Sequence, residues 1–230
     1  MTPSLAQRLA QVREAVASAA ARSGEDQPVT LIGVSKRQPL TAILEARAAG
    51  LLDFGENYAQ ELHEKAEAIQ DAPAPRWHFI GPLQSNKVKL VAGSHLIHTA
   101  DRPKLLEKLE ARAVPQDVLI QVNLTGEPQK AGIRPDELPD LLDRFADFDH
   151  VRCRGLMLIP PQGTPEATRP HFADLRALRD RHAKIARPGV QLRALSMGMS
   201  ADFHVAIEEG ATLVRVGTAI FGPRGVVAPA

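Results

Sequence analysis

Short apolar runs and helical repeats alternate along this chain. Apolar residues recur at three- and four-residue spacing near the N-terminus, which predicts a helix over residues 3–22. Eight apolar runs then predict strands at residues 29–35, 51–54, 77–81, 95–99, 117–122, 151–157, 191–196 and 212–217. Helical patterns separate them at residues 40–49, 58–69, 83–91, 102–113, 136–146, 167–186 and 201–209. Pro103, Pro135 and Pro170 lie close to predicted helix starts, where a missing N–H costs little.

This alternation predicts an α/β fold. Most of the predicted strands are continuous apolar runs, which is typical of a parallel sheet covered by helices. Eight strands in 230 residues match a (β/α)8 TIM barrel in number and length. A doubly wound open sheet is the competing architecture, but its first turn is usually glycine-rich, whereas the first turn here reads SKRQP. We therefore predict one domain over residues 1–230, a single (β/α)8 TIM barrel with an extra N-terminal helix.

Composition narrows the setting in which the protein works. Hydrophobic residues make up 44% of the chain and charged residues 24%, and the formal net charge is +1. Nothing in that balance points to nucleic acid or a membrane surface as a partner. The single cysteine, Cys153, excludes an intrachain disulfide and suits a reducing compartment. The N-terminus lacks the apolar stretch of a secretory signal, and no apolar run is long enough to span a bilayer, so we expect a cytoplasmic protein.

Polar and small residues gather at the carboxyl ends of the predicted strands, where the active sites of barrels lie. The first strand ends in Ser35-Lys36, and two interpretations of Lys36 stay open. It either extends from the strand end into solvent, or it presents an amine at the barrel mouth. Strand alternation places Lys36 on one face with Ile32 and Val34, so it points inward if those two residues fill the barrel. A desolvated amine there is a nucleophile that can form a Schiff base.

The loops after the seventh and eighth strands contain two candidate anion sites. SMGMSADF at residues 196–203 combines small residues with a helix start near Ser200, whose N–H groups favour an anion, although ordinary capping by Ser200 is the alternative. Gly217 and Thr218 add a close backbone N–H and a hydroxyl, although they are also compatible with a simple turn. Because these loops form the usual phosphate site of a barrel, two neighbouring candidates favour a phosphate ligand.

Arg215 is predicted to face inward with Leu213, and a buried guanidinium needs a partner because it keeps its charge. One alternative is an ion pair with a carboxylate such as Glu56. The other is a hydrogen bond to an aromatic nitrogen of a ligand that His78 and Asn57 flank, although His78 by itself is more typical of a structural histidine. The histidines lack HxxH or HExxH spacing, so we expect no metal site.

Together these residues resemble the pyridoxal phosphate homeostasis proteins. The matching stretches cover nearly the whole chain: VSK at 34–36, FGENYAQEL at 54–62, WHFIGPLQSNK at 77–87, KAGI at 130–133, GLM at 155–157, LSMGMSADF at 195–203 and VRVGTAIFG at 214–222. The resemblance implies the barrel of the alanine racemase N-terminal domain and the cofactor pyridoxal 5′-phosphate (PLP), held by Lys36 as an aldimine. It also implies phosphate contacts from Ser196, Met197, Gly217 and Thr218, a contact of Arg215 with the pyridine nitrogen, and a ring pocket lined by Asn57, His78 and Met157.

One position departs from the resemblance. Many relatives have a second lysine two places after the Schiff-base lysine, and this chain has Gln38 there. If that lysine helps to exchange the cofactor, transfer differs in this protein. Lys87 and Lys130 are candidates for lysines at the barrel mouth, with ordinary solvated surface charges as the alternative.

The residues also bear on catalysis. An arginine at the pyridine nitrogen leaves that nitrogen unprotonated and weakens the ring as an electron sink. Racemases of related fold add a tyrosine from a C-terminal domain, whereas this sequence ends at Ala230 and its one tyrosine is Tyr58. We therefore expect a non-catalytic PLP-binding protein of vitamin B6 homeostasis, a monomer or weak dimer that contacts apo forms of PLP-dependent enzymes transiently. The alternatives are an amino-acid racemase that uses Lys36 and Tyr58, and a class I aldolase of a phosphorylated sugar.

Overall fold

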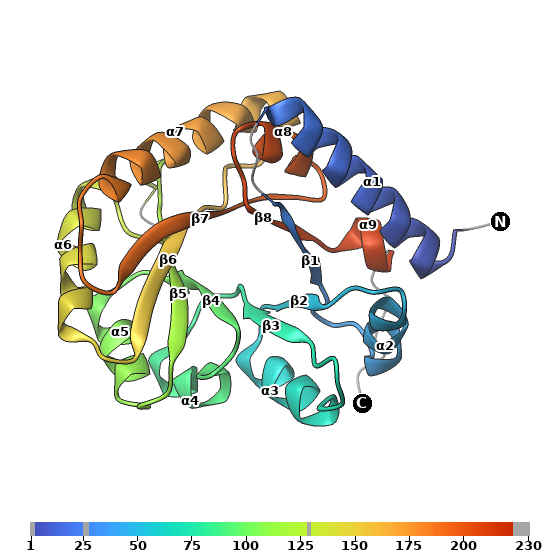
Figure 1. Cartoon of the computed structure of the whole chain (residues 1–230), viewed down its shortest axis with the longest axis horizontal. Helices are drawn as coiled ribbons and strands as arrows, with labels where there is room; N and C mark the ends of the chain where they lie inside the picture. The colour runs from blue at the N-terminus through green and yellow to red at the C-terminus, as the bar shows by residue number, and fades with distance from the viewer. Residues whose placement is uncertain (1–2, 25–27, 128–129, 223–230) are drawn as a thin grey trace.

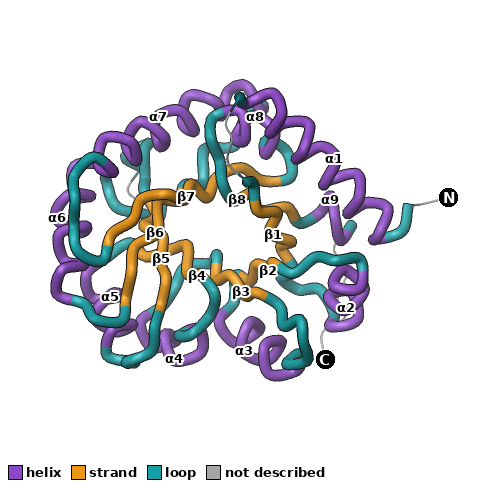
Figure 2. The backbone as a smooth tube through the Cα atoms, in the orientation of Figure 1, coloured by secondary structure: helices purple, strands orange, loops and turns teal. Residues whose placement is uncertain are grey.

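The computed structural model describes residues 3–24, 28–127 and 130–222. Parallel strands in this part of the chain close into a barrel in the order β1 to β8, and β8 pairs with β1 (Figures 1 and 2). The strands are Thr30–Val34 (β1), Asp53–Glu56 (β2), Arg76–Phe79 (β3), Leu96–Ala100 (β4), Gln116–Gln121 (β5), Val151–Met157 (β6), Val190–Met199 (β7) and Leu213–Val216 (β8). The predicted (β/α)8 barrel with an extra N-terminal helix is confirmed.

Helices surround this barrel as an outer layer, seen in purple around the orange strands in Figure 2. The α-helices are Leu5–Ser23 (α1), Leu40–Ala48 (α2), Ala59–Ala68 (α3), Val88–Val91 (α4), Pro103–Glu110 (α5), Leu138–Asp143 (α6), Pro165–Ala183 (α7), Phe203–Glu208 (α8) and Thr218–Phe221 (α9). Short 3-10 turns flank α4 and α6 at Ser85–Lys87 (η1), Pro135–Glu137 (η2) and Arg144–Asp147 (η3). No helix among the described residues is both long and apolar enough to cross a membrane.

The prolines test the predicted helix starts. Pro103 and Pro135 are the first residues of α5 and η2, as expected. Pro170 lies inside α7, so its predicted place near the helix start is wrong. That helix begins earlier because Thr164 caps it, with its hydroxyl accepting the Ala167 N–H at 3.3 Å, and because Pro165 occupies the first position.

Helix α1 completes the outer layer where the barrel closes. Up to residue 222, where the described part of the chain ends, the segment after β8 forms only the four-residue α9, and α1 packs beside α8 and α9 on the outside of β8 and β1 (Figure 1). Its inner face buries residues at helical spacing: Leu5, Leu9, Val12, Val16 and Ala19. Ser4 begins the helix with a capping box in which its hydroxyl accepts the Gln7 N–H and its own N–H donates to the Gln7 side chain.

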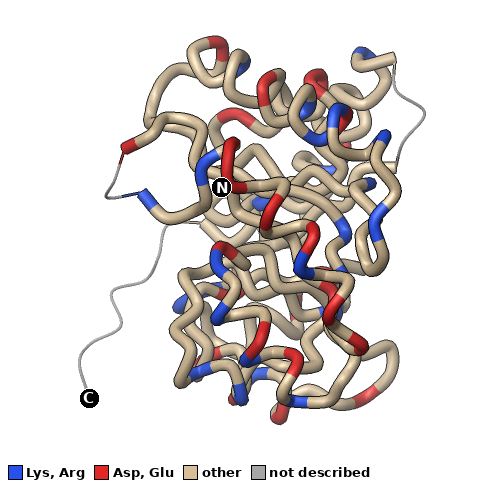
Figure 3. Tube along the Cα trace, turned by 90° about the vertical axis from the view of Figure 1, so that its left-hand side faces the viewer, with Lys and Arg blue, Asp and Glu red and all other residues tan. Residues whose placement is uncertain are grey.

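Most of the core lies between the barrel and the helices, and a smaller apolar cluster fills the barrel interior. The interior cluster consists of Ile32, Leu96, Leu119, Met157 and Leu213. Ile32 is fully buried there, which confirms the predicted inward face of β1. Outside, acidic and basic positions are interspersed along the side shown in Figure 3, in keeping with the net charge of +1.

Candidate functional site

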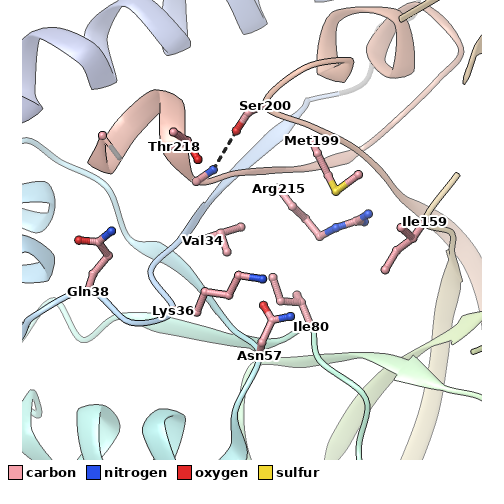
Figure 4. A pocket seen from close by; sticks show the side chains of 12 residues that line it. Val34, Lys36, Gln38, Asn57, Ile80, Ile159, Met199, Ser200, Arg215 and Thr218 are labelled. Atoms are coloured by element: carbon pink, nitrogen blue, oxygen red, sulfur yellow. Dashed lines mark hydrogen bonds between the residues drawn. The ribbon is translucent and has the colours of Figure 1, made fainter. Parts of the chain in front are cut away.

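A cavity of about 220 Å³ opens at the carboxyl ends of β1 and β8 (Figure 4). Its lining consists of Val34, Lys36, Gln38, Asn57, Ile80, Ile159, Met199, Ser200, Arg215, Gly217, Thr218 and Gly222. Two of these side chains are basic and none is acidic. Lys36 and Arg215 therefore make the cavity cationic, and the hydroxyls of Ser200 and Thr218 add donors.

Lys36 stands in a tight turn that its neighbours fix. The Gln38 N–H donates to the Ser35 carbonyl at 3.0 Å, and the Ser35 hydroxyl donates to Glu56 at 2.6 Å. Arg37 has φ of 59°, a left-handed conformation that a side chain makes costly. Its N–H donates to the Glu61 carboxylate at 2.6 Å, which offsets part of that cost. The turn therefore sets where Lys36 leaves the backbone.

A buried ion pair supports this turn from behind. The Lys65 ammonium donates to the Ser35 carbonyl at 2.8 Å and to carboxylate oxygens of Glu56 and Glu61 at 2.7 Å each. Burial raises the pKa of Glu56 to about 7, against the opposing attraction of Lys65. Arg215 makes its hydrogen bonds to Ser196 and Leu158 instead, so the ion pair of Arg215 with Glu56 that we considered from the sequence is wrong.

Arg215 is buried and makes hydrogen bonds to uncharged oxygens. Its Nη1 donates to the Ser196 hydroxyl at 2.6 Å, and its Nη2 donates to the Leu158 carbonyl at 3.0 Å. Burial lowers the pKa of Arg215 to about 10, and attraction from Asp202 opposes this change, so the side chain is charged at neutral pH. The two bonds fix the guanidinium plane while the side chain still lines the cavity (Figure 4).

The two predicted anion loops meet at the cavity. The Ser200 hydroxyl accepts the Gly217 N–H at 3.2 Å, which joins the loop after β7 to the turn after β8 (Figure 4). Asp202 accepts the Met199 N–H at 2.7 Å and so shapes the first loop. Thr218 begins α9, and the first N–H groups of a helical turn have no acceptor within the helix. The arrangement offers hydroxyl and N–H donors at one side of the cavity.

Asn57 lines the cavity at the end of β2. Its backbone lies so close to Gly81 that a Cβ at Gly81 would come within 2.0 Å of the Asn57 carbonyl oxygen, so only glycine fits there. The side-chain oxygen of Asn57 is buried and has no hydrogen-bond partner among the described residues. A buried amide oxygen without a partner is costly unless a donor reaches it. A ligand with a hydrogen-bond donor fits this position.

Five of the predicted cofactor-binding residues line this cavity, namely Lys36, Asn57, Arg215, Gly217 and Thr218. The other four, His78, Met157, Ser196 and Met197, are buried and lie outside the lining. Met157 belongs to the apolar cluster inside the barrel, and Met197 packs in the outer core. The cavity contacts predicted for these four residues stay predictions.

Sequence reasoning missed residues that lie one step further along the same strands. Ile80 follows His78 by two positions and Ile159 follows Met157 by two, and both line the cavity. Period-two counting continued past the predicted strand ends could have found them. For Ser200 the sequence left an anion site and a helix cap open, and its hydroxyl contacts Gly217 beside the cavity.

Gln38 and the residues considered for the barrel mouth differ in how they relate to the Lys36 cavity. Gln38 lines the cavity, so the position where this chain lacks the second lysine of many relatives lies at the site itself. Tyr58 and Lys87 line a neighbouring cavity, and the Tyr58 hydroxyl accepts a hydrogen bond from Arg37 at 3.0 Å. Lys130 forms an ion pair with Glu127 at 2.5 Å.

One group of side chains could hold a metal ion by geometry alone. Ligand atoms of Asp53, His78 and His95 lie within 4.8 Å of one another at the end of the barrel opposite to Lys36. Sequence spacing could not reveal this group because three strands or strand ends contribute to it. Arg76 already donates to both carboxylate oxygens of Asp53, at 2.7 and 2.5 Å, so a cation is in place there.

The class of protein is a closed (β/α)8 barrel with a cationic cavity at its mouth. A lysine, a buried arginine and two donor-rich loops form that cavity. The profile of the alanine racemase N-terminal domain matches residues 7–225. A pyridoxal phosphate homeostasis protein of Aquifex aeolicus is 45% identical over 95% of this chain and 97% of its own length, and one of Escherichia coli K12 is 42% identical over 96% and 97%. The chain therefore belongs to the alanine racemase N-terminal domain family, in the group whose curated members are named pyridoxal phosphate homeostasis proteins.

Solved structures agree with this assignment. PipY of Synechococcus elongatus, in a structure with PLP bound, is 38% identical, with a TM-score of 0.81 over 95% of this chain and all of its own. Alanine racemase from Corynebacterium glutamicum shares the fold at 17% identity, with a TM-score of 0.65 over 94% of this chain and 63% of its own.

Proposed function

We propose that this protein binds pyridoxal 5′-phosphate and takes part in intracellular vitamin B6 homeostasis. The observation that carries the proposal is one cavity with the Lys36 amine, the Arg215 guanidinium and the hydroxyls of Ser200 and Thr218, and without an acidic side chain in its lining. PLP supplies an aldehyde that condenses reversibly with a primary amine, and its phosphate is an anion. The relatives named for PLP homeostasis and PipY with PLP bound support the same ligand.

The residues present fit this ligand. Lys36 is the amine that would hold the aldehyde, and Arg215 would donate to the ring nitrogen, which is an acceptor. Gly217, Thr218 and Ser200 would surround the phosphate, with the hydroxyls and the Thr218 N–H as donors and the Gly217 N–H holding the Ser200 hydroxyl. The buried Asn57 oxygen would accept a hydrogen bond from the ring substituents. Ile80 and Ile159 would lie along the ring.

We further propose that binding proceeds without catalytic turnover and that the protein transfers PLP to apo-enzymes. The racemase alternative requires Tyr58 as a second base, and Tyr58 accepts a hydrogen bond from Arg37 and lies outside the lining of the Lys36 cavity. A single amine without an opposed base supports capture and release of the aldehyde better than racemisation.

The test is a PLP titration of the full chain, followed by borohydride reduction and peptide mapping. We expect one cofactor per chain attached to Lys36, no attachment in Lys36→Ala, and normal attachment in the control Lys87→Ala. Attachment that persists in Lys36→Ala would overturn the assignment. Lys36-dependent racemisation of an amino acid by the loaded protein would support the racemase alternative, whereas the absence of any bound PLP would leave the aldolase alternative.

A further inference from the structure

A row of hydrogen bonds crosses the barrel interior and ends on Arg215. Ser196 Oγ, which accepts from Arg215, lies 2.8 Å from His98 Nδ1. His98 Nε2 lies 3.0 Å from His78 Nδ1, and His78 Nε2 lies 3.0 Å from an Asp53 carboxylate oxygen. Asp53 is the first residue of β2, so the row runs from the mouth to the opposite end of the barrel.

With neutral histidine rings, the two ends of this row fix the direction of every bond in it. Arg215 can only donate, and an ionised Asp53 can only accept. Although burial opposes ionisation, hydrogen bonds from Arg76 and His78 lower the pKa of Asp53 to about 2. If every bond in the row is made, Ser196 donates to His98 Nδ1 and each histidine carries its proton on Nε2. The reverse direction would turn a lone pair of His78 toward the carboxylate, unless His78 carried a second proton.

The surroundings favour a neutral His98 ring. Ser196, His78 and His98 are all buried. Burial lowers the pKa of His98 well below its usual value, and the nearby positive charge of Arg215 acts in the same direction. His95 contacts the His78 ring edge to face, but none of its bonds belongs to the row.

We propose that Asp53, His78, His98 and Ser196 are positioning residues for Arg215, which orient its guanidinium through the row of hydrogen bonds across the barrel interior. A row of aligned polar bonds presents an oxygen lone pair to Arg215 and so stabilises its charge. A carboxylate in direct contact with Arg215 would also stabilise its charge, but it would repel an anionic ligand. Because the row contacts Arg215 through a hydroxyl, the cavity stays cationic. The carboxylate of Asp202 attracts Arg215 from a distance.

The first experiment requires no cofactor and therefore does not depend on the proposed function. Ring 15N chemical shifts of the histidines in the full chain at neutral pH report tautomer and charge, with His78→Leu and His98→Leu variants giving the assignments. We expect His78 and His98 to be neutral and protonated on Nε2. A proton on Nδ1 alone, or a doubly protonated ring at either residue, overturns the proposed row.

The second experiment rests on the proposed function, because it uses PLP labelled with 15N in the ring. We expect His98→Leu and Ser196→Ala to bind PLP about tenfold more weakly and to shift the ring-nitrogen resonance, since a hydrogen bond to a charged group is lost or misaligned. Ser196→Thr retains the hydroxyl and should restore both, and His95→Leu should change neither.

Circular dichroism shows whether each variant is folded, and Ser196→Ala replaces His98→Leu if the latter is not. Unchanged affinity and ring-nitrogen shift in a folded Ser196→Ala variant would overturn the positioning role. If the unmodified protein binds no PLP, the proposed function fails, and the histidine tautomers alone decide whether the row exists.

Discussion

At the scale of single residues, the turn after β1 stores conformational strain beside the Lys36 amine. Arg37 adopts a left-handed backbone that glycine enters without steric cost, and its guanidinium lies over the Tyr58 ring with 5.5 Å between Cζ and the ring centroid. Strain of this kind is typical of sites whose geometry the surrounding structure fixes. The Lys36 turn is therefore held in place against its own backbone preference.

Comparing Arg37→Ala with Arg37→Gly measures this strain. Both variants lose the contacts with Tyr58, but only alanine keeps a Cβ in the left-handed region. We expect Arg37→Gly to be more stable than Arg37→Ala by about 1 kcal/mol in denaturant unfolding. The control is Glu45 on an exposed face of α2, where the order should reverse because glycine disfavours a helix. Equal stability of the two Arg37 variants would show that the turn is unstrained.

Residue-level prediction from strand alternation succeeded where the alternation is regular. Counting by twos placed Ile32 inside the barrel and Lys36 at the cavity. The phosphate contact of Ser196 came from the resemblance and stays a prediction, and β7 contains a register shift between Ser196 and Met199 relative to β8. A bulge adds a residue to one strand and changes which side chains reach the mouth. The sequence carries no clear signal of that bulge, so it could not be predicted which residues along each strand would line the cavity.

At the scale of elements, Glu110 joins α5 to the start of β6. It ends the helix, where a carboxylate is unfavourable to the helix dipole. The backbone N–H groups of Asp149, His150 and Val151 donate to it at 3.0 Å each, and the His150 ring lies 2.7 Å away. Although burial works against ionisation, these bonds lower the pKa of Glu110 to about 2.

The hydrogen bonds from Asp149, His150 and Val151 to Glu110, here called the Glu110 clamp, predict a pH dependence of stability. Because the pKa of Glu110 is lower in the folded than in the unfolded protein, its contribution is complete above the unfolded value of 4.5 and is lost as the pH falls toward 2. We expect Glu110→Ala to lose about 1–3 kcal/mol of unfolding free energy at pH 7, since charged hydrogen bonds carry such values. The difference from the unmodified protein should shrink between pH 4.5 and 2.

Glu107→Ala is the matched control, since Glu107 lies on the same helix and binds Arg144 at the exposed surface. It should cost little and show no such pH dependence. A loss for Glu110→Ala that stays constant from pH 7 to pH 2 would contradict the clamp.

The elements themselves followed from the hydrophobic pattern, because parallel strands buried on both faces give continuous apolar runs. The strand predicted at residues 151–157 matches β6, whereas that predicted at 51–54 begins two residues before β2. Leu51 is buried in the core without belonging to the strand, and burial alone cannot distinguish the two cases in sequence. The helix predicted at 136–146 is divided into η2, α6 and η3.

At the scale of the whole molecule, the N-terminal helix reaches the ligand cavity through one hydrogen bond. Arg8 Nε on α1 donates to the Ile220 carbonyl at 2.8 Å, and Ile220 belongs to α9, the helix that Thr218 begins. The extra helix thus does more than cover the barrel. It holds the short turn that carries one side of the proposed phosphate site.

Two arginines of α1 allow this link to be tested. Arg13 donates to the Ala49 carbonyl at 2.9 Å, near the end of α2 and away from the cavity. We expect Arg8→Ala and Arg13→Ala to lose similar unfolding free energy, about 1 kcal/mol each. Only Arg8→Ala should also weaken PLP binding, roughly fivefold, because the lost bond is worth ~1 kcal/mol to the position of Thr218. Equal PLP affinities of the two variants in parallel titrations would show that α1 stabilises the barrel without positioning the site.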